Sequence, residues 1–215
     1  MAHHEQPRIP LSAWRPMMFG LLGVLLMGAL LFTAAGTFTW PQGWTFLALW
    51  AVAIIVPHVA LARENPSLLK RRAVGRRSEW RYERILYGIY VVLILALPVV
   101  AGLDVQRFAT AEMPAALVHP GTLLVLFGGV AQAWAMTENN HYEAGMRIQR
   151  DIGHKVVYNG PYRIVRHPGY LAAIVQTAGA PLVLCSAWAW IPAAGIALLL
   201  VARALLEDRA LNEGL

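Results

Sequence analysis

Six long apolar stretches, separated by short polar segments, set the pattern of this chain. Each is close to the roughly 20 residues that an α-helix needs to cross a bilayer. They run approximately over Met17–Ala35, Trp44–Ala62, Ile85–Gly102, Pro120–Thr137, Tyr170–Ser186 and Trp188–Leu206. The join between the last two is too short for a further domain, so these stretches predict a C-terminal helical hairpin. We therefore expect an all-α, polytopic membrane bundle of about six transmembrane segments.

Composition supports a single integral-membrane domain over residues 1–215. Hydrophobic residues make up 58% of the chain and charged residues only 14%, compared with about 25% charged residues in a typical soluble domain. The polar first 16 residues lack a small-residue cleavage site, so we expect no cleaved signal peptide. The single cysteine, Cys185, excludes an internal disulfide and a cysteine-based metal site. We expect no metal.

The basic residues are distributed unevenly between the two sets of loops. In a six-span arrangement, 17 of the 18 lysines and arginines fall on one side, and only Arg107 falls on the other. Positive charge marks the cytoplasmic side, so both termini are predicted to be cytoplasmic. The basic segment Arg63–Ile85 shows no clean helical stripe and predicts a surface beside anionic membrane lipids. No soluble basic domain is present, so nucleic acid is not an expected partner.

One polar run, His154–Tyr170, has a composition unlike that of a plain connecting loop. It reads HKVVYNGPYRIVRHPGY, and its centre, Asn159-Gly160-Pro161, is typical of a turn. Around the turn stand two tyrosines, two arginines and two histidines, where an ordinary loop would carry Ser, Asp and Gly. The same charge count places this run on the cytoplasmic side, and we predict that it binds a cofactor there.

A second polar group lies at the inner end of the last apolar stretch, over Arg203–Arg209. Arg203 and Glu207 are four residues apart and therefore share one helix face. Two readings remain open at this point. In the first reading, the two side chains form an interfacial ion pair that contributes little to stability. In the second, Glu207 points toward the polar run and helps to bind a charged small molecule. The tyrosines and arginines of the run have their own simpler reading, as interfacial aromatics and topology charges.

Together these residues resemble the isoprenylcysteine carboxyl methyltransferase family of membrane enzymes, whose wider superfamily includes phospholipid N-methyltransferases. The resemblance is carried by GPYRIVRHPGY, an apolar hairpin and then R-x-x-x-E-D. Upstream, Arg63-Glu-Asn-Pro-Ser-Leu-Leu and the segment from Asn140 to His154 look like bacterial members. The resemblance covers most of the chain and implies a catalytic half over about 139–211. It also implies the inner membrane of a bacterium, with a cytoplasmic active site.

The resemblance implies a methyltransferase that uses S-adenosyl-L-methionine as its cofactor. The residues that it assigns to the cofactor are Gln149, His154, Lys155, Val156, Val157, Tyr162, His167, Pro168, Gly169, Tyr170 and Glu207. It places Arg203 near the methyl-accepting group, so the expected catalytic residues are Arg203 and Glu207. The family also uses a glutamine upstream of the histidine matched by His154, and Gln149 is the nearest glutamine in this sequence.

The chemistry of the residues favours an acceptor that is already ionised. A carboxylate needs no base, only a cation such as Arg203 to hold it, whereas a thiol or an amine must lose a proton to Glu207 or a histidine. We expect a hydrophobic or lipid-like acceptor that enters from the bilayer and carries a carboxylate. The alternatives are a methyltransferase acting on a lipid amine or thiol, a membrane reductase that uses NADPH and has a related core, and a non-catalytic membrane scaffold.

Overall fold

The computed structural model describes residues 9–74, 81–110, 113–143 and 157–214. These residues are almost entirely helical and contain no strand, which confirms the all-α prediction. The α-helices are α1 (Arg15–Ala35), α2 (Pro41–Glu64), α3 (Pro66–Val74), α4 (Arg81–Gly102), α5 (Val118–Glu138), α6 (Pro168–Val183) and α7 (Trp190–Gly214). Short helical turns are η1 (Leu11–Trp14), η2 (Leu103–Phe108), η3 (Ala115–Leu117) and η5 (Gly160–Arg163).

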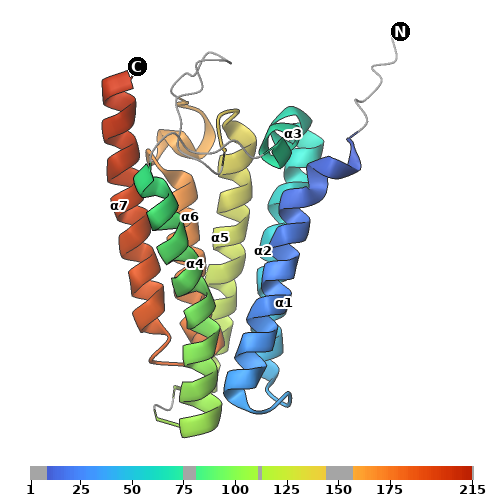
Figure 1. The fold of residues 1–215 in the computed structure, drawn as a ribbon, viewed down its shortest axis with the longest axis vertical. Coiled ribbons are helices and arrows are strands. Elements are labelled where there is room, and N and C mark those ends of the chain that lie inside the picture. Colours follow the sequence, from blue (N-terminus) through green and yellow to red (C-terminus); the bar gives the residue numbers. More distant parts are fainter. Residues whose placement is uncertain (1–8, 75–80, 111–112, 144–156, 215) are drawn as a thin grey trace.

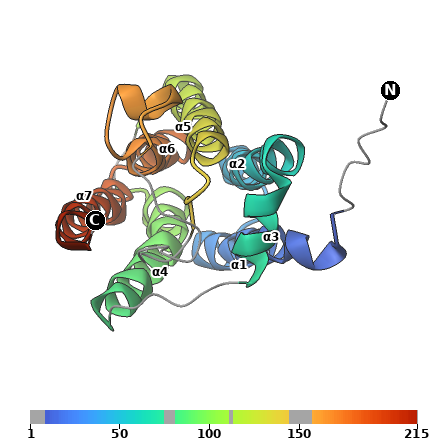
Figure 2. The same ribbon diagram turned by 90° about the horizontal axis from the view of Figure 1, so that it is seen from above.

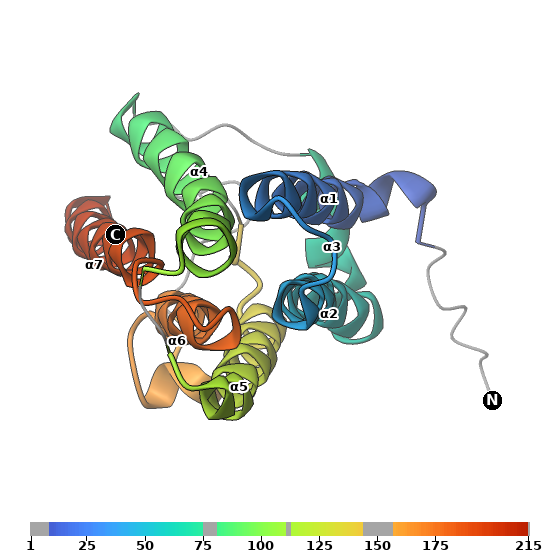
Figure 3. The same cartoon turned by 90° about the horizontal axis from the view of Figure 1, so that it is seen from below.

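The six long helices form a closed ring. Going round it, α1 packs against α2, α2 against α5, α5 against α6, α6 against α7, α7 against α4, and α4 against α1 again. This order is visible when the bundle is viewed along its axis from either end (Figures 2 and 3). The core between the helices is apolar and contains Leu31, Leu97, Val125 and Ile196.

Five helical stretches are long and apolar enough to cross a membrane: Leu11–Ala35, Pro41–Glu64, Tyr82–Phe108, Ala115–Glu138 and Trp190–Arg209. Between 22% and 28% of their most apolar windows is buried inside the bundle, so most of this apolar surface faces outward. That is the arrangement expected for helices surrounded by lipid, and it confirms the integral-membrane prediction.

The fifth predicted span, Tyr170–Ser186, is shorter than expected. It was predicted to reach Ser186, but α6 has 16 residues and ends at Val183. Cys185 then adopts a left-handed conformation with φ of 52°, which a continuing α-helix cannot accommodate. At 1.5 Å per residue, α6 is about 24 Å long. It nevertheless runs beside α5 and α7 and so preserves the alternation of helix direction (Figure 1).

Helices α5 and α6 approach each other closely because glycines line their contact. A Cβ atom at Gly128 would lie 2.7 Å from the carbonyl oxygen of Ala172 and from Cβ of Gln176. At Gly179, a Cβ atom would lie 2.6 Å from the carbonyl oxygen of Gly121. Small residues at such positions let two membrane helices pack backbone against backbone. The pair α5–α6 is therefore a rigid base for the segment that precedes α6.

The basic segment after α2 contains a helix that the sequence pattern did not predict. Asn65 accepts a hydrogen bond from the backbone N–H of Leu68 on its side-chain oxygen (3.1 Å), and Pro66 occupies the first turn of α3. This is a standard helix start, with a capping asparagine followed by proline. Leu68 and Leu69 are fully buried beneath the helix. The segment is thus fixed to the bundle by apolar contacts as well as by charge.

The alternating direction of the helices brings one set of ends together. The start of α1, the whole of α3, the starts of α4 and α6 and the ends of α5 and α7 meet at the same end of the bundle (Figure 1). Among the described residues, every basic residue except Arg107 lies in these elements, at the end of α2 (Arg63) or in the segment just before α6 (Arg163 and Arg166). Arg107 lies in η2 near Gly36, at the opposite end. The predicted grouping of the charges is present; that this end faces the cytoplasm remains a prediction.

Candidate functional site

The turn predicted at Asn159-Gly160-Pro161 is present and is seated on the end of α5. Asn159 is extended, Gly160 has a φ of 54°, and Pro161 lies in the first turn of η5. A Cβ atom at Gly160 would lie 2.6 Å from Cγ of Glu138. Glycine is needed here for two reasons, because the backbone is left-handed and because α5 leaves no room for a side chain.

Tyr162 attaches this turn to α5. Its hydroxyl accepts a hydrogen bond from Nδ2 of Asn139 (3.0 Å) and donates one to the carbonyl oxygen of Ala135 (3.3 Å). Burial is the main reason that the pKa of Tyr162 is raised above its ordinary value, so the phenol stays protonated. In contrast, Arg163 and Arg166 are exposed, as the reading of these two as topology charges predicts.

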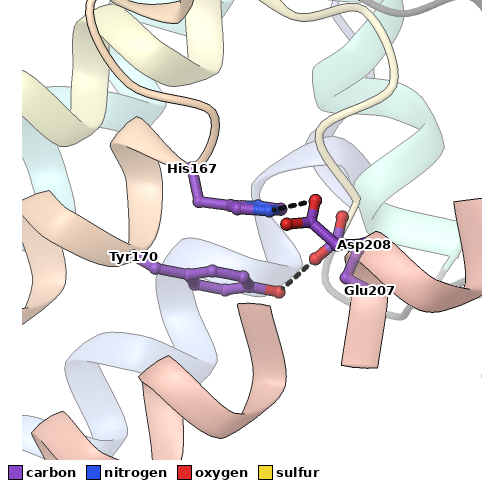
Figure 4. Close-up of polar contacts among 4 residues, drawn as sticks. All are labelled: His167, Tyr170, Glu207 and Asp208. Carbon is purple, nitrogen blue, oxygen red and sulfur yellow. Dashed lines mark hydrogen bonds and ion pairs between the residues drawn. The ribbon is translucent and has the colours of Figure 1, made fainter. Parts of the chain in front are cut away.

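The His-Pro-Gly-Tyr sequence forms the entry to α6 and presents two rings to α7 (Figure 4). His167 directly precedes the helix, and Pro168, which is buried, begins it. The rings of His167 and Tyr170 stack with 5.5 Å between their centroids and 21° between their planes. The three-residue spacing therefore brings the imidazole and the phenol onto one side of the chain, facing the end of α7.

Two successive acids on α7 meet these rings (Figure 4). Nε2 of His167 lies 2.9 Å from Oδ1 of Asp208, and the hydroxyl of Tyr170 donates a hydrogen bond of 2.6 Å to Oε2 of Glu207. Glu207 thus points toward the polar segment, which was one of the two readings of this residue. Each ring has its own carboxylate partner, so residues 37 and 41 positions apart in the chain form one cluster.

Arg203 lies one helical turn before Glu207, but its partner comes from α4. Its terminal nitrogen is 2.5 Å from Oε1 of Glu83, and both side chains are largely buried, with 16% and 5% exposed. The guanidinium also lies over the ring of Tyr170, 5.7 Å from its centroid. The simpler expectation, an i,i+4 pair between Arg203 and Glu207, is replaced by an ion pair that joins α7 to α4.

A second aromatic group borders the same entry from the side of α5. A Cβ atom at Gly169 would lie 2.7 Å from Cε2 of Tyr142, so the tyrosine ring packs directly on the backbone of the His-Pro-Gly-Tyr sequence. Nε2 of Gln132 donates to the Tyr142 hydroxyl, and Arg72 of α3 donates to its backbone carbonyl oxygen at 2.9 Å. Burial raises the pKa of Tyr142, and the nearby positive charge of Arg72 opposes this shift.

Sequence reasoning did not single out Glu83, Asp208, Tyr142, Gln132 or Arg72 as site residues. Glu83 carried a signal, because it is an acid among arginines at the start of an apolar stretch, where topology calls for positive charge. Arg72 looked like one more topology charge. Of the predicted residues, Val157 is half-buried just before the turn. Gln149, His154, Lys155 and Val156 lie outside the described residues.

The positions that form this cluster coincide with a region of known sequence similarity. Residues 121–213 match the model of the Isoprenylcysteine carboxyl methyltransferase (ICMT) family. The resemblance to the ICMT family is confirmed. The match begins in α5 and ends in α7, so it contains the turn, His167, Tyr170, Arg203 and Glu207 but not Glu83.

Two curated rice proteins are similar to part of this chain. Both are described as "Probable protein-S-isoprenylcysteine O-methyltransferase", one from Oryza sativa subsp. indica and one from Oryza sativa subsp. japonica. Each is 30% identical over 69 residues, which are 32% of this chain and 36% of the relative. The similarity therefore spans about a third of these relatives. No solved structure shows a significant match to the chain.

Proposed function

We propose that this chain is an S-adenosylmethionine-dependent methyltransferase that methylates a hydrophobic acceptor at the membrane. The observation that carries the proposal is the cluster in which His167 and Tyr170 of the α6 entry meet Asp208 and Glu207 of α7. It lies inside the segment that matches a methyltransferase family. The start of α6 lies at the end of the bundle that carries most of the described basic residues (Figure 1), where a charged cofactor would enter from water.

The chemistry of this cluster fits the proposed cofactor. Adenosylmethionine carries an ammonium group, a carboxylate, a ribose, an adenine ring and a positively charged sulfonium. Carboxylates such as Glu207 and Asp208 suit an ammonium group and ribose hydroxyls, while flat rings such as Tyr170 and His167 suit an adenine or a sulfonium cation. When bound, adenosylmethionine would supply a methyl group activated by the positive charge on its sulfur.

The chain's own residues would then orient the acceptor and exclude water. In-line displacement depends above all on alignment of the reacting atoms, which rigid helices can provide. Arg203 is held between Glu83 and the ring of Tyr170, and a guanidinium has five N–H donors, so the contact with Glu83 does not saturate it. We propose that Arg203 holds an acceptor carboxylate, which needs no base. An amine or thiol acceptor would instead pass its proton to Glu207.

The proposed acceptor class combines an apolar tail with a carboxylate. The names of the rice relatives refer to an S-isoprenylcysteine, which has both features. The outward faces of the helices are apolar, so a molecule with such a tail can reach the bundle laterally from the lipid. A prenylated cysteine and a long-chain fatty acid are therefore the first two probes of acceptor activity.

Binding of S-adenosylhomocysteine tests the proposal directly. Isothermal titration into the detergent-purified chain should show saturable binding, and Glu207→Gln and Tyr170→Phe should each weaken it by about tenfold or more. The first removes the charge and the second the hydroxyl donor of a half-buried, charge-assisted hydrogen bond. Arg163→Gln is the control, since this exposed residue lies in the same loop.

The outcomes separate the alternatives. Absence of binding to a wild-type chain that is shown to be folded would contradict the proposal. Titration of the same sample with NADPH would then identify a reductase, and binding of neither ligand would leave the scaffold. Equal affinity in wild type, Glu207→Gln and Tyr170→Phe would show a cofactor site elsewhere in the chain.

A further inference from the structure

Among the described residues outside the family match, Glu83 is the one that forms an ion pair with Arg203, beside the cluster. Glu83 lies in the first turn of α4 and is only 4% exposed. Its carboxylate reaches across to Arg203 of α7 at 2.5 Å. A buried carboxylate is costly unless a cation compensates it, and the same holds for a buried guanidinium. The two residues therefore depend on each other, although 120 positions separate them in the chain.

The position of Arg203 creates an electrostatic problem for the proposed reaction. Its guanidinium lies 5.7 Å from the centroid of the Tyr170 ring, and Tyr170 is bound to Glu207. A sulfonium cofactor held by this tyrosine and this glutamate would sit near a second positive charge. Two like charges repel strongly in the partly dehydrated interior of a protein. Without a counter-ion, Arg203 would help an acidic acceptor but would oppose the methyl donor.

We propose that Glu83 is a specificity-determining residue that allows the site to bind a positively charged methyl donor beside Arg203. By compensating the guanidinium, Glu83 sets how strongly the site discriminates between the cationic donor and its neutral product. This inference rests on the proposed methyltransferase function.

The charge balance of the reaction gives this discrimination a consequence. During transfer the bond between sulfur and the methyl carbon breaks, its electron pair stays on sulfur, and the sulfonium becomes a neutral thioether. The methyl carbon forms a bond to the acceptor oxygen, and the carboxylate becomes a neutral ester. Glu83 keeps Arg203 compensated after the acceptor has lost its charge. The donor, which carries one more positive charge than the thioether, is therefore the more sensitive of the two to the charge at position 83.

A purely structural role for the ion pair makes a different prediction. If Glu83 only ties α4 to α7, its loss disturbs the site in the same way for both ligands, and their affinities fall together. If Glu83 acts through charge, its loss weakens the cationic ligand selectively. The ratio of the two dissociation constants therefore separates the two roles.

The experiment is a titration of S-adenosylmethionine and of S-adenosylhomocysteine into wild type and Glu83→Gln. Glutamine keeps the volume and a hydrogen-bonding oxygen but removes the charge. We expect the Kd for the sulfonium to rise about tenfold more than the Kd for the thioether, the effect of a carboxylate and a sulfonium roughly 10 Å apart at an effective dielectric constant of about 20. Glu64→Gln is the matched control, because Glu64 is an exposed acid at the end of α2.

Two further variants keep the test decisive if Glu83→Gln folds poorly. Arg203→Gln removes the positive charge beside Glu83, so the ratio should shift in the opposite direction, toward tighter binding of the sulfonium. The double variant Glu83→Gln with Arg203→Gln removes both charges and should return the ratio toward the wild-type value. Parallel loss of both affinities, or a ratio that stays shifted in the double variant, would overturn the inference. A wild type that binds neither ligand would instead refute the methyltransferase proposal itself.

Discussion

Arg203 shows how a single side chain can take part in two contacts that its own helix does not provide. Its guanidinium pairs with Glu83, lies over the ring of Tyr170 and stands one turn from Glu207. The spacing along α7 placed Arg203 and Glu207 on one face, as expected. It did not indicate that the two residues would choose different partners. In the structure, Glu207 accepts from Tyr170 while Arg203 bridges to α4.

The role proposed for Arg203 predicts a split between turnover and cofactor binding. With a prenylated cysteine as acceptor and radiolabelled donor, Arg203→Gln should lower kcat/KM by about tenfold to a hundredfold, the effect of losing a charge-assisted hydrogen bond. The Kd for neutral S-adenosylhomocysteine should change much less. Methyl esters release methanol in base, whereas methylated amines do not, so the same assay identifies the acceptor atom.

Thermal unfolding of the variant gives the control, because loss of Arg203 leaves Glu83 buried without this partner. Equal losses of turnover and of S-adenosylhomocysteine affinity would argue against an acceptor role for Arg203. Base-stable product would move the assignment from a carboxylate to a lipid amine.

At the scale of elements, the contact between α5 and α6 positions the site. Gly128 and Gly179 bring the two backbones together, and Gly160 seats the turn on the end of α5. Tyr162 then ties the turn to the same helix. The His-Pro-Gly-Tyr sequence therefore begins α6 beside a turn and a helix contact that are tightly packed through glycines. This packing leaves the sequence little room to move, which suits a site that works by aligning the reacting atoms.

Gly128→Ala tests the importance of this helix contact. A methyl group at Gly128 would lie 2.7 Å from atoms of Ala172 and Gln176, so α6 must shift, and we expect destabilisation of about 1–3 kcal/mol. Gly23→Ala is the matched control, because a Cβ atom there has no neighbour within 4 Å and alanine favours the helix.

The measurement is the midpoint of thermal unfolding in detergent. It should fall for Gly128→Ala and stay constant or rise for Gly23→Ala. If the two variants unfold at the same temperature, close backbone packing between α5 and α6 is not a source of stability.

At the scale of the whole molecule, the ring of six helices separates two kinds of end. One end collects the turn, the side-chain cluster and the described basic residues other than Arg107. The opposite end carries Arg107 and the joins from α1 to α2, α4 to α5 and α6 to α7 (Figure 1). The short helix α6 is essential to this separation, because without it the cluster on α7 and the turn before α6 would lie at opposite ends. The excess of positive charge predicts that the end with the cluster is cytoplasmic.

Cysteine labelling tests this orientation. In a Cys185→Ala background, Gln106→Cys places a thiol in η2, and Arg163→Cys places one in the turn; both positions are exposed. A membrane-impermeant maleimide added to intact cells should label Gln106→Cys, and should label Arg163→Cys only after the membrane is opened. The reverse pattern would contradict the predicted orientation and would place the cofactor entry on the outside.

The sequence alone determined the features that depend on local pattern. The lengths of the apolar stretches predicted the helices, and the uneven distribution of the basic residues predicted that positive charge gathers at one end of the bundle. Asn159-Gly160-Pro161 predicted the turn. All three properties arise from neighbours in the chain. The motif around His167 and Tyr170 was enough to recognise the resemblance to the ICMT family, whose model matches residues 121–213. The capping signal of α3 at Asn65-Pro66 was also local, but the charged residues around it obscured it.

Only the tertiary structure decided which side chains meet. Whether Arg203 pairs with Glu207 or with Glu83, and whether Tyr142 packs on Gly169, depends on how helices far apart in the chain are placed around the ring. Periodicity describes one helix at a time and holds no information on the rotation or depth of another. The counter-ion of Arg203 comes from a helix outside the family match because a buried charge takes its partner from whichever helix packs against it.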